Sequence, residues 1–126
     1  MTADPLLSIA LVDDKSYGLQ QIQNAIPASA ELEWFSSAND FLASGKTFDF
    51  VFLDYYLDED GITGDTIVSA VQQYAKEIIA FSSVPSGNKK ILLAGAQRSF
   101  LKLLGDNNDA LHTFFLTFLV ERRSVD

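Results

Sequence analysis

The stretch FDFVFLD, which spans residues 48–54, decides the fold of this chain. Apart from Asp49, the residues before Asp54 are apolar, which is typical of a strand buried on both faces of a parallel sheet. Three other apolar runs also stop at polar residues: IALV (9–12) before Asp13 and Asp14, IIAF (78–81) before Ser82, and FL (100–101) before Lys102. Because parallel strands end at one edge of a sheet, we predict that these polar side chains share one site.

The predicted site is rich in carboxylates. Asp13, Asp14 and Asp54 would repel one another at close range, so the cluster needs a cation. Oxygen ligands suit a hard divalent ion, and we predict Mg2+. Taken alone, Asp13 or Asp14 could instead cap the helix that follows, and Asp54 could be no more than a strand-end residue.

Apolar runs alternate with amphipathic runs along the chain. The predicted strands span residues 8–12, 32–34, 48–53, 78–81 and 100–101. The predicted helices span residues 15–25, 38–43, 65–74, 85–94 and, from a cap at 107–109, a last stretch to 122–123, with an acidic loop at 55–64. This alternation predicts an α/β fold of the flavodoxin-like kind, with five helices and a doubly wound sheet of five parallel strands in the order 2-1-3-4-5. We expect a single domain over residues 1–126.

Composition narrows the functional classes. The chain of 126 residues has no cysteine, which excludes a disulfide framework, a thiol nucleophile and a zinc finger. Its net charge of -8 argues against direct binding of nucleic acid, which needs a basic surface. The apolar run 114–120 is far shorter than the roughly 20 residues that cross a bilayer, and no targeting signal is recognisable. We therefore expect a cytoplasmic protein without a membrane partner.

In its motifs the chain resembles the receiver domains of two-component response regulators, including the chemotaxis-regulator type. The resemblance covers about residues 7–123 and rests on LVDD (11–14), FLD (52–54), GDTIV (64–68), FSS (81–83), and AGA (94–96) followed by Lys102. It implies a phosphorelay protein that catalyses only its own phosphorylation and dephosphorylation, and so not an enzyme in the usual sense.

The resemblance also implies a role for each polar residue. Asp54 would be the phosphoacceptor, while Lys102 and Ser82 would contact the phosphoryl oxygens. The ligands of Mg2+ would be Asp13, Asp14, Asp54 and the backbone carbonyl of Tyr56. The phosphodonor histidine would belong to a sensor histidine kinase or a histidine phosphotransfer protein. A downstream protein target or a second copy of the chain would bind the face made by the fourth helix, the fifth strand and the last helix, where Leu116 and Val120 are expected to be exposed.

Some positions depart from the receiver pattern. Leu103 and Asp58 stand where proline is frequent, Ser99 replaces an aromatic switch residue, and the loop 54–64 is about two residues longer than usual. These changes leave open a degenerate receiver that acts as a phosphorylation-independent protein-binding module. A hydrolase of the haloacid dehalogenase type is disfavoured, because its Asp-x-Asp-x-Thr signature is absent at residues 13–16. A calcium loop at 56–67 is disfavoured too, because Tyr56 and Ile67 would be its end ligands.

Overall fold

A five-stranded parallel sheet forms the centre of the molecule. The computed structural model describes residues 7–59 and 61–125. The sheet strands are β1 (Ser8–Val12), β2 (Glu31–Phe35), β3 (Phe48–Leu53), β6 (Ala75–Ser82) and β7 (Arg98–Leu101). Their spatial order is β2-β1-β3-β6-β7, and every neighbouring pair is parallel. Counting only the strands of this sheet, the order is 2-1-3-4-5, so the predicted flavodoxin-like topology is confirmed.

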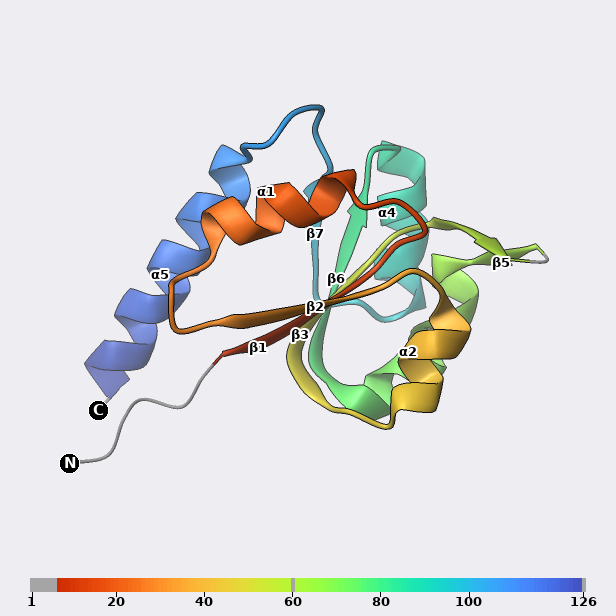
Figure 1. Cartoon of the computed structure of the whole chain (residues 1–126), viewed down its shortest axis with the longest axis horizontal. Helices are drawn as coiled ribbons and strands as arrows, with labels where there is room; N and C mark the ends of the chain where they lie inside the picture. The colour runs from red at the N-terminus through yellow and green to blue at the C-terminus, as the bar shows by residue number, and fades with distance from the viewer. Residues whose placement is uncertain (1–6, 60, 126) are drawn as a thin grey trace.

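Helices cover both faces of the sheet (Figure 1). They are α1 (Tyr17–Ala25), α2 (Ala38–Ser44), α3 (Val68–Val71), α4 (Pro85–Ala94) and α5 (Asp109–Val125). One apolar cluster joins α1 and α5 to one face, and a second joins α2, α3 and α4 to the other. No helix in the described part of the chain is both long and apolar enough to cross a membrane.

Strand β3 shows why the run at 48–53 is apolar throughout. Phe50 and Phe52 point into the cluster under α1 and α5, whereas Val51 and Leu53 point into the opposite cluster. The Phe50 ring lies 5.2 Å from the ring of Phe118 in an edge-to-face contact. Both faces of the strand are therefore buried, as the sequence predicts for a parallel sheet.

The segment after Asp54 differs from the expected acidic loop. It forms a small antiparallel hairpin of β4 (Tyr56–Glu59) and β5 (Ile62–Thr63), which projects away from the main sheet (Figure 1). Leu57 is 1% exposed and Ile62 packs against the same core cluster, so both strands of the hairpin are anchored in the core. The prediction of an irregular loop was wrong because this short apolar anchor lies among acidic residues.

The helix predicted at 65–74 is also different. The chain forms the 3-10 turn η1 (Gly64–Ile67), the single α-turn α3, and the 3-10 turn η2 (Gln72–Tyr74). At its start, the Gly64 amide donates a 2.8 Å hydrogen bond to the Tyr55 carbonyl. A Cβ on Gly64 would lie 2.2 Å from the Asp54 carbonyl oxygen, so only glycine allows this approach. Elsewhere β6 and β7 start earlier than predicted, and α5 continues past Arg123 to Val125.

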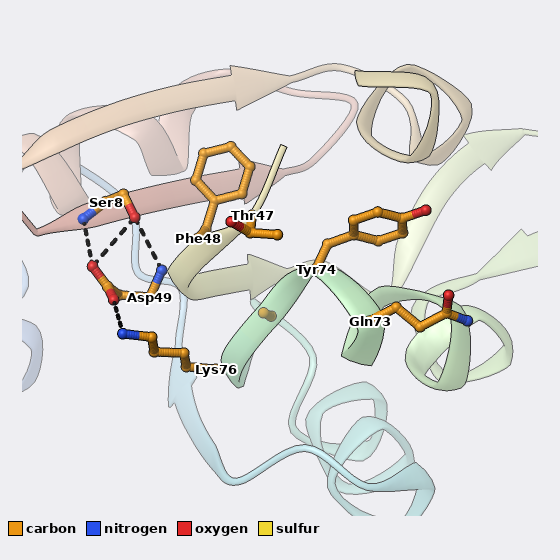
Figure 2. A pocket seen from close by; sticks show the side chains of 8 residues that line it. Ser8, Thr47, Phe48, Asp49, Gln73, Tyr74 and Lys76 are labelled. Carbon is orange, nitrogen blue, oxygen red and sulfur yellow. Dashed lines mark hydrogen bonds and ion pairs between the residues drawn. The ribbon is translucent and has the colours of Figure 1, made fainter. Parts of the chain in front are cut away.

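At the amino edge of the sheet lies a cavity of about 310 Å3 lined by Ser8, Asp49 and Lys76, among others (Figure 2). Asp49 accepts hydrogen bonds from the Ser8 amide (2.9 Å) and hydroxyl (3.2 Å). Lys76 lies 3.1 Å from the other oxygen of the same carboxylate. This edge is far from the strand ends that carry the predicted site.

Candidate functional site

The backbone brings the predicted site residues to the carboxyl edge of the sheet. The Asp54 amide donates a 3.1 Å hydrogen bond to the Val12 carbonyl, so the ends of β1 and β3 lie side by side. The Lys102 amide donates a 3.0 Å hydrogen bond to the Ser82 carbonyl, which joins the ends of β6 and β7 in the same way. The polar residues that follow the strands therefore face a common region.

Three carboxylates gather there. Oxygens of Asp13, Asp14 and Asp54 all lie within 4.8 Å of one another. Asp13 is fully buried, Asp54 is 6% exposed, and Asp14 is half-buried. One lysine cannot balance three carboxylates, and every group in the cluster offers oxygen, so the residues fit a hard divalent cation such as Mg2+.

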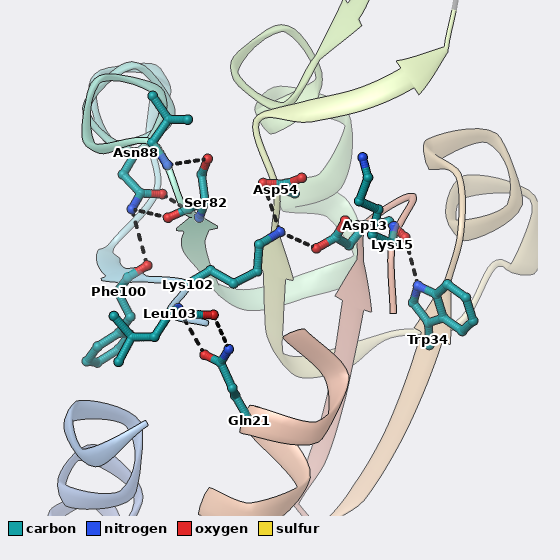
Figure 3. Close-up of polar contacts among 11 residues, drawn as sticks. Asp13, Lys15, Gln21, Trp34, Asp54, Ser82, Asn88, Phe100, Lys102 and Leu103 are labelled. Carbon is teal, nitrogen blue, oxygen red and sulfur yellow. Dashed lines mark hydrogen bonds and ion pairs between the residues drawn. The ribbon is translucent and has the colours of Figure 1, made fainter. Parts of the chain in front are cut away.

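Lys102 extends between two of these carboxylates (Figure 3). Its Nζ lies 2.5 Å from Asp13 Oδ2 and 3.4 Å from Asp54 Oδ1, and the side chain is 3% exposed. The ammonium also lies 4.9 Å from the centre of the Tyr17 ring. Burial lowers the pKa of Lys102, but the hydrogen bond to Asp13 and the charges of Asp13 and Asp54 outweigh it, so the pKa is raised. Lys102 therefore stays charged.

Burial also disfavours the charged form of the carboxylates, and in their case this raises the pKa. It raises the pKa of Asp13 to about 6, helped by repulsion from Asp54 and opposed by Lys102 and by the Lys15 amide. The pKa of Asp54 is also raised, chiefly by burial and against the attraction of Lys102. Burial thus disfavours the ionised form of both carboxylates, and an added cation would favour it.

Ser82 completes the predicted set and is 1% exposed. Its hydroxyl accepts a 3.1 Å hydrogen bond from the Val84 amide. Its backbone is held by Asn88 of α4, whose Oδ1 accepts from the Ser82 amide at 2.8 Å. Asn88 Nδ2 donates to the carbonyls of Ser82 and Phe100, both at 3.2 Å, so this side chain ties the first turn of α4 to β6 and β7 (Figure 3).

Sequence reasoning missed Asn88, and it also missed Trp34 and Gln21. Trp34 of β2 donates from Nε1 to the Asp13 carbonyl at 2.7 Å. Gln21 of α1 and Asn88 of α4 are polar residues in otherwise apolar buried stripes. A buried polar side chain needs partners, and this exception to the helical pattern was the available signal.

The structure shows where most of the residues that depart from the receiver pattern lie. Ser99 is exposed, while Phe100 is half-buried and packs on Phe114 at 5.3 Å between ring centres. The peptide bonds of the described residues are all trans, including that between Lys102 and Leu103. The Tyr56 side chain is 57% exposed, and the metal role of its backbone carbonyl stays a prediction. The side chain of Asp58 lies outside the described residues.

Comparison of the structure with solved structures finds similar proteins where comparison of the whole sequence finds none. No protein-family model and no curated protein matches the chain by sequence. Among solved structures, the BeF3-activated receiver domain of DrrB superposes with a TM-score of 0.72 at 22% identity, over 90% of this chain and 97% of that one. The response regulator DrrB of Thermotoga maritima gives 0.73 at 22% identity, over 93% of this chain and 54% of that one, so the chain spans about half of that protein. A CheY-like receiver domain from Methanospirillum hungatei gives 0.69 at 18% identity, over 96% and 99%.

These likenesses define the class of fold. Almost the whole of each single-domain match is covered. The chain therefore has the fold of a response-regulator receiver domain, and the resemblance in its motifs agrees with this fold.

Proposed function

We propose that the chain is a phosphoacceptor receiver in a two-component phosphorelay, with Asp54 as the acceptor. The observation that carries the proposal is the meeting of Asp13, Asp14, Asp54 and Lys102 at the end of the central strands of a receiver fold. A carboxylate at that position can act as a nucleophile toward phosphorus. Its flanking charges can stabilise the transferring group, which is most of what such a reaction needs.

The proposed reaction moves one phosphoryl group. An Asp54 carboxylate oxygen attacks phosphorus, the bond between phosphorus and a histidine nitrogen of the partner breaks, and the imidazole takes up a proton. Lys102 would pair with one phosphoryl oxygen, and the Ser82 hydroxyl would turn from the Val84 amide to donate to another. Mg2+, held by Asp13, Asp14, Asp54 and the Tyr56 carbonyl, would neutralise charge on the phosphoryl group when bound. The chain would process no other substrate, and we place it in the cytoplasm with its sensor kinase or phosphotransfer protein.

Intact-mass measurement tests this function. The protein is mixed with Mg2+ and acetyl phosphate, and uptake of one phosphoryl group is expected. Asp54→Asn should abolish the mass change, whereas Asp49→Asn at the opposite edge should leave it intact. Uptake that survives Asp54→Asn, or no uptake by the unmodified chain, would contradict the assignment.

The proposed output surface is the α4–β7–α5 face. It exposes Leu93 (78%), Leu101 (43%), Leu116 (52%) and Val120 (67%), so the predicted exposure of Leu116 and Val120 is confirmed. Large exposed apolar side chains are common on protein-binding surfaces. We propose that phosphorylation promotes binding of a downstream protein or of a second copy through this face.

Sedimentation tests the output surface. Beryllofluoride with Mg2+, which imitates the phosphoryl group, should raise the sedimentation coefficient of the wild type alone or of its complex with a partner. The double variant Leu116→Glu, Val120→Glu should lose this response, while a control change at exposed Gln23 of α1 to Glu should keep it. A response that survives the double variant would place the output surface elsewhere.

A phosphorylation-independent binding module remains the second candidate. The ion pair between Lys102 and Asp13 favours it, because it occupies a carboxylate that Mg2+ would need. The exposed aliphatic side chains of the α4–β7–α5 face are also present without a phosphoryl group. This candidate predicts partner binding that is equal for the wild type and Asp54→Asn.

A further inference from the structure

The loop that follows Lys102 has little apolar anchoring. Leu103 is 40% exposed and Leu104 is 93% exposed, and Gly105 adopts a positive φ of 94°. Residues 103–108 include no proline to restrict the backbone. Packing therefore does not explain how this loop keeps the Lys102 ammonium between two carboxylates.

A fully buried amide on α1 holds the loop instead. Gln21 is 0% exposed, and its Nε2 donates to the carbonyls of Leu103 and of Gly105, the latter at 3.0 Å. Its Oε1 accepts from the Leu103 amide at 3.2 Å and from Asn108 Nδ2 at 3.0 Å. Both donors and both acceptor positions of the carboxamide are therefore used.

Asn108 extends the same network to the other side of Lys102. It is 5% exposed, and its Nδ2 also donates to the Leu101 carbonyl at 3.0 Å. Its Oδ1 accepts from the Leu111 amide at 3.3 Å, in the first turn of α5. The backbone just before and just after Lys102 is thus bound by two amide side chains that also bind each other.

Helix α1 also limits the path of the lysine side chain. A Cβ on Gly18, one turn before Gln21, would lie 2.8 Å from Lys102 Cδ. The same helix thus holds the backbone through Gln21 and lies directly against the aliphatic stem at Gly18. Figure 3 shows Gln21 bound to Leu103 next to the extended Lys102 side chain.

We propose that Gln21 is a positioning residue for Lys102: its amide, together with Asn108, fixes the loop so that the lysine ammonium reaches the acceptor carboxylate. Gln21 does not touch the reacting atoms and acts only through Lys102. This inference rests on the proposed phosphoacceptor function for its effect on phosphoryl transfer. Its effect on the position of Lys102 does not depend on that function.

A double-mutant cycle measures the coupling. Gln21→Met keeps a similar unbranched shape and removes every hydrogen bond. It is expected to slow phosphoryl uptake from acetyl phosphate by roughly ten- to a hundredfold, because small misplacements of a catalytic group have effects of this size. In a Lys102→Ala background, adding Gln21→Met should change the remaining rate by less than about twofold, since a residue that acts only through Lys102 has nothing left to position. Equal slowing in both backgrounds would overturn the proposal.

Two matched variants separate positioning from general loss of stability. Asn24→Ala removes contacts from the same helix to the same loop, namely those to Asp106 and Asn107. Leu42→Ala destabilises the fold from the opposite face of the sheet, where Leu42 packs on the other core cluster. Neither variant should slow uptake as Gln21→Met does. Equal slowing by either variant would show that the effect is not specific to the hydrogen bonds between Gln21 and the loop after Lys102.

A second measurement is independent of phosphorylation. In NMR spectra of lysine ammonium groups, the buried Lys102 should give a signal protected from solvent exchange, identified by its loss in Lys102→Ala. Gln21→Met should broaden or shift that signal, and Asn24→Ala and Leu42→Ala should preserve it. An unchanged Lys102 signal in Gln21→Met would overturn the proposal that Gln21 positions Lys102. If the wild type takes up no phosphoryl group while the signal responds as expected, only the proposed function fails.

Discussion

The amino and carboxyl edges of the sheet, where its strands begin and end, contain the same kinds of side chain, but the pKa of aspartate shifts in opposite directions at the two edges. At the amino edge, Asp49 is bound by Ser8 and paired with Lys76. Burial tends to raise the pKa of Asp49, but the hydrogen bonds from Ser8 and Lys76 outweigh it, and the pKa is lowered. The folded state therefore favours the ionised form of Asp49.

At the carboxyl edge, Lys102 serves Asp13 and Asp54 together, and the pKa of each carboxylate is raised. Both edges contain aspartate, lysine and serine, so residue type does not decide the outcome. Depth of burial decides it, because Asp13 and Asp54 are buried whereas Asp49 is only half-buried. An edge that gathers several buried carboxylates is suited to a hard cation, whereas a single paired carboxylate such as Asp49 needs none.

Metal affinity should separate the two edges most strongly. Replacing Asp13 and Asp14 together with alanine should weaken Mg2+ binding by at least about a hundredfold, because removal of ligand carboxylates leaves too few oxygens for a hard ion. Asp49→Asn should leave the affinity unchanged. Isothermal titration calorimetry with Mg2+ measures both. Undiminished affinity in the double variant would place the metal elsewhere.

Lys102 and Lys76 should also differ in how much each contributes to the free energy of unfolding. In metal-free protein at pH 7, Lys102→Met should lower the free energy of unfolding by about 3–5 kcal/mol, because it leaves buried carboxylates without a cation. Lys76 is 81% exposed, so Lys76→Met should cost well under about 1 kcal/mol. Urea unfolding followed by circular dichroism measures the difference. Equal losses would mean that the two ion pairs are equivalent.

Neutralising Asp13 should stabilise the metal-free fold. Its folded pKa of about 6 exceeds the ordinary value of 3.8, so the folded state binds the proton more tightly and stability falls as pH rises between these values. Asparagine does not ionise, so the Asp13→Asn variant avoids this fall in stability. It should be more stable than the wild type by on the order of 2–3 kcal/mol at pH 7. The difference should vanish below pH 3.8. Urea unfolding in a chelator at several pH values tests it, and a destabilised variant at pH 7 would contradict it.

Neutralising Asp49 should have the opposite and smaller effect. Its pKa is lowered from 3.8 in the folded state, so its contribution is present above that value and is lost as pH falls through the folded pKa. Asp49→Asn should cost about 1 kcal/mol at pH 7, the usual size for a hydrogen-bonded group. The cost should shrink under acid conditions. A stability gain at pH 7 would remove the contrast between the edges.

Much of the carboxyl edge could be predicted from the sequence. Apolar runs that end at Asp13, Asp54, Ser82 and Lys102 indicate parallel strands, and parallel strands bring their ends together. The burial of Lys102 between two carboxylates could not be predicted in the same way. It depends on the path of a side chain across the sheet edge, which strand patterns do not specify.

The segments that were predicted wrongly depend on tertiary contacts. The hairpin of β4 and β5 is held by Leu57 and Ile62, and its alternation is too short to be recognised among acidic residues. Gln21 interrupts an apolar helical stripe, and its partners lie more than eighty residues away. Local periodicity contains no information on such distant hydrogen bonds.

Trp34 gives the site an optical property. It is the only tryptophan in the chain, it is 40% exposed, and its indole N–H is bound to the Asp13 carbonyl. Emission excited at the red edge of the absorption band therefore comes from one fluorophore attached to the backbone of a site aspartate. Any event that displaces Asp13 alters the solvation of that indole. The chain thus contains an intrinsic fluorophore hydrogen-bonded to the site, and we expect its emission to change when a ligand displaces Asp13, without an introduced dye.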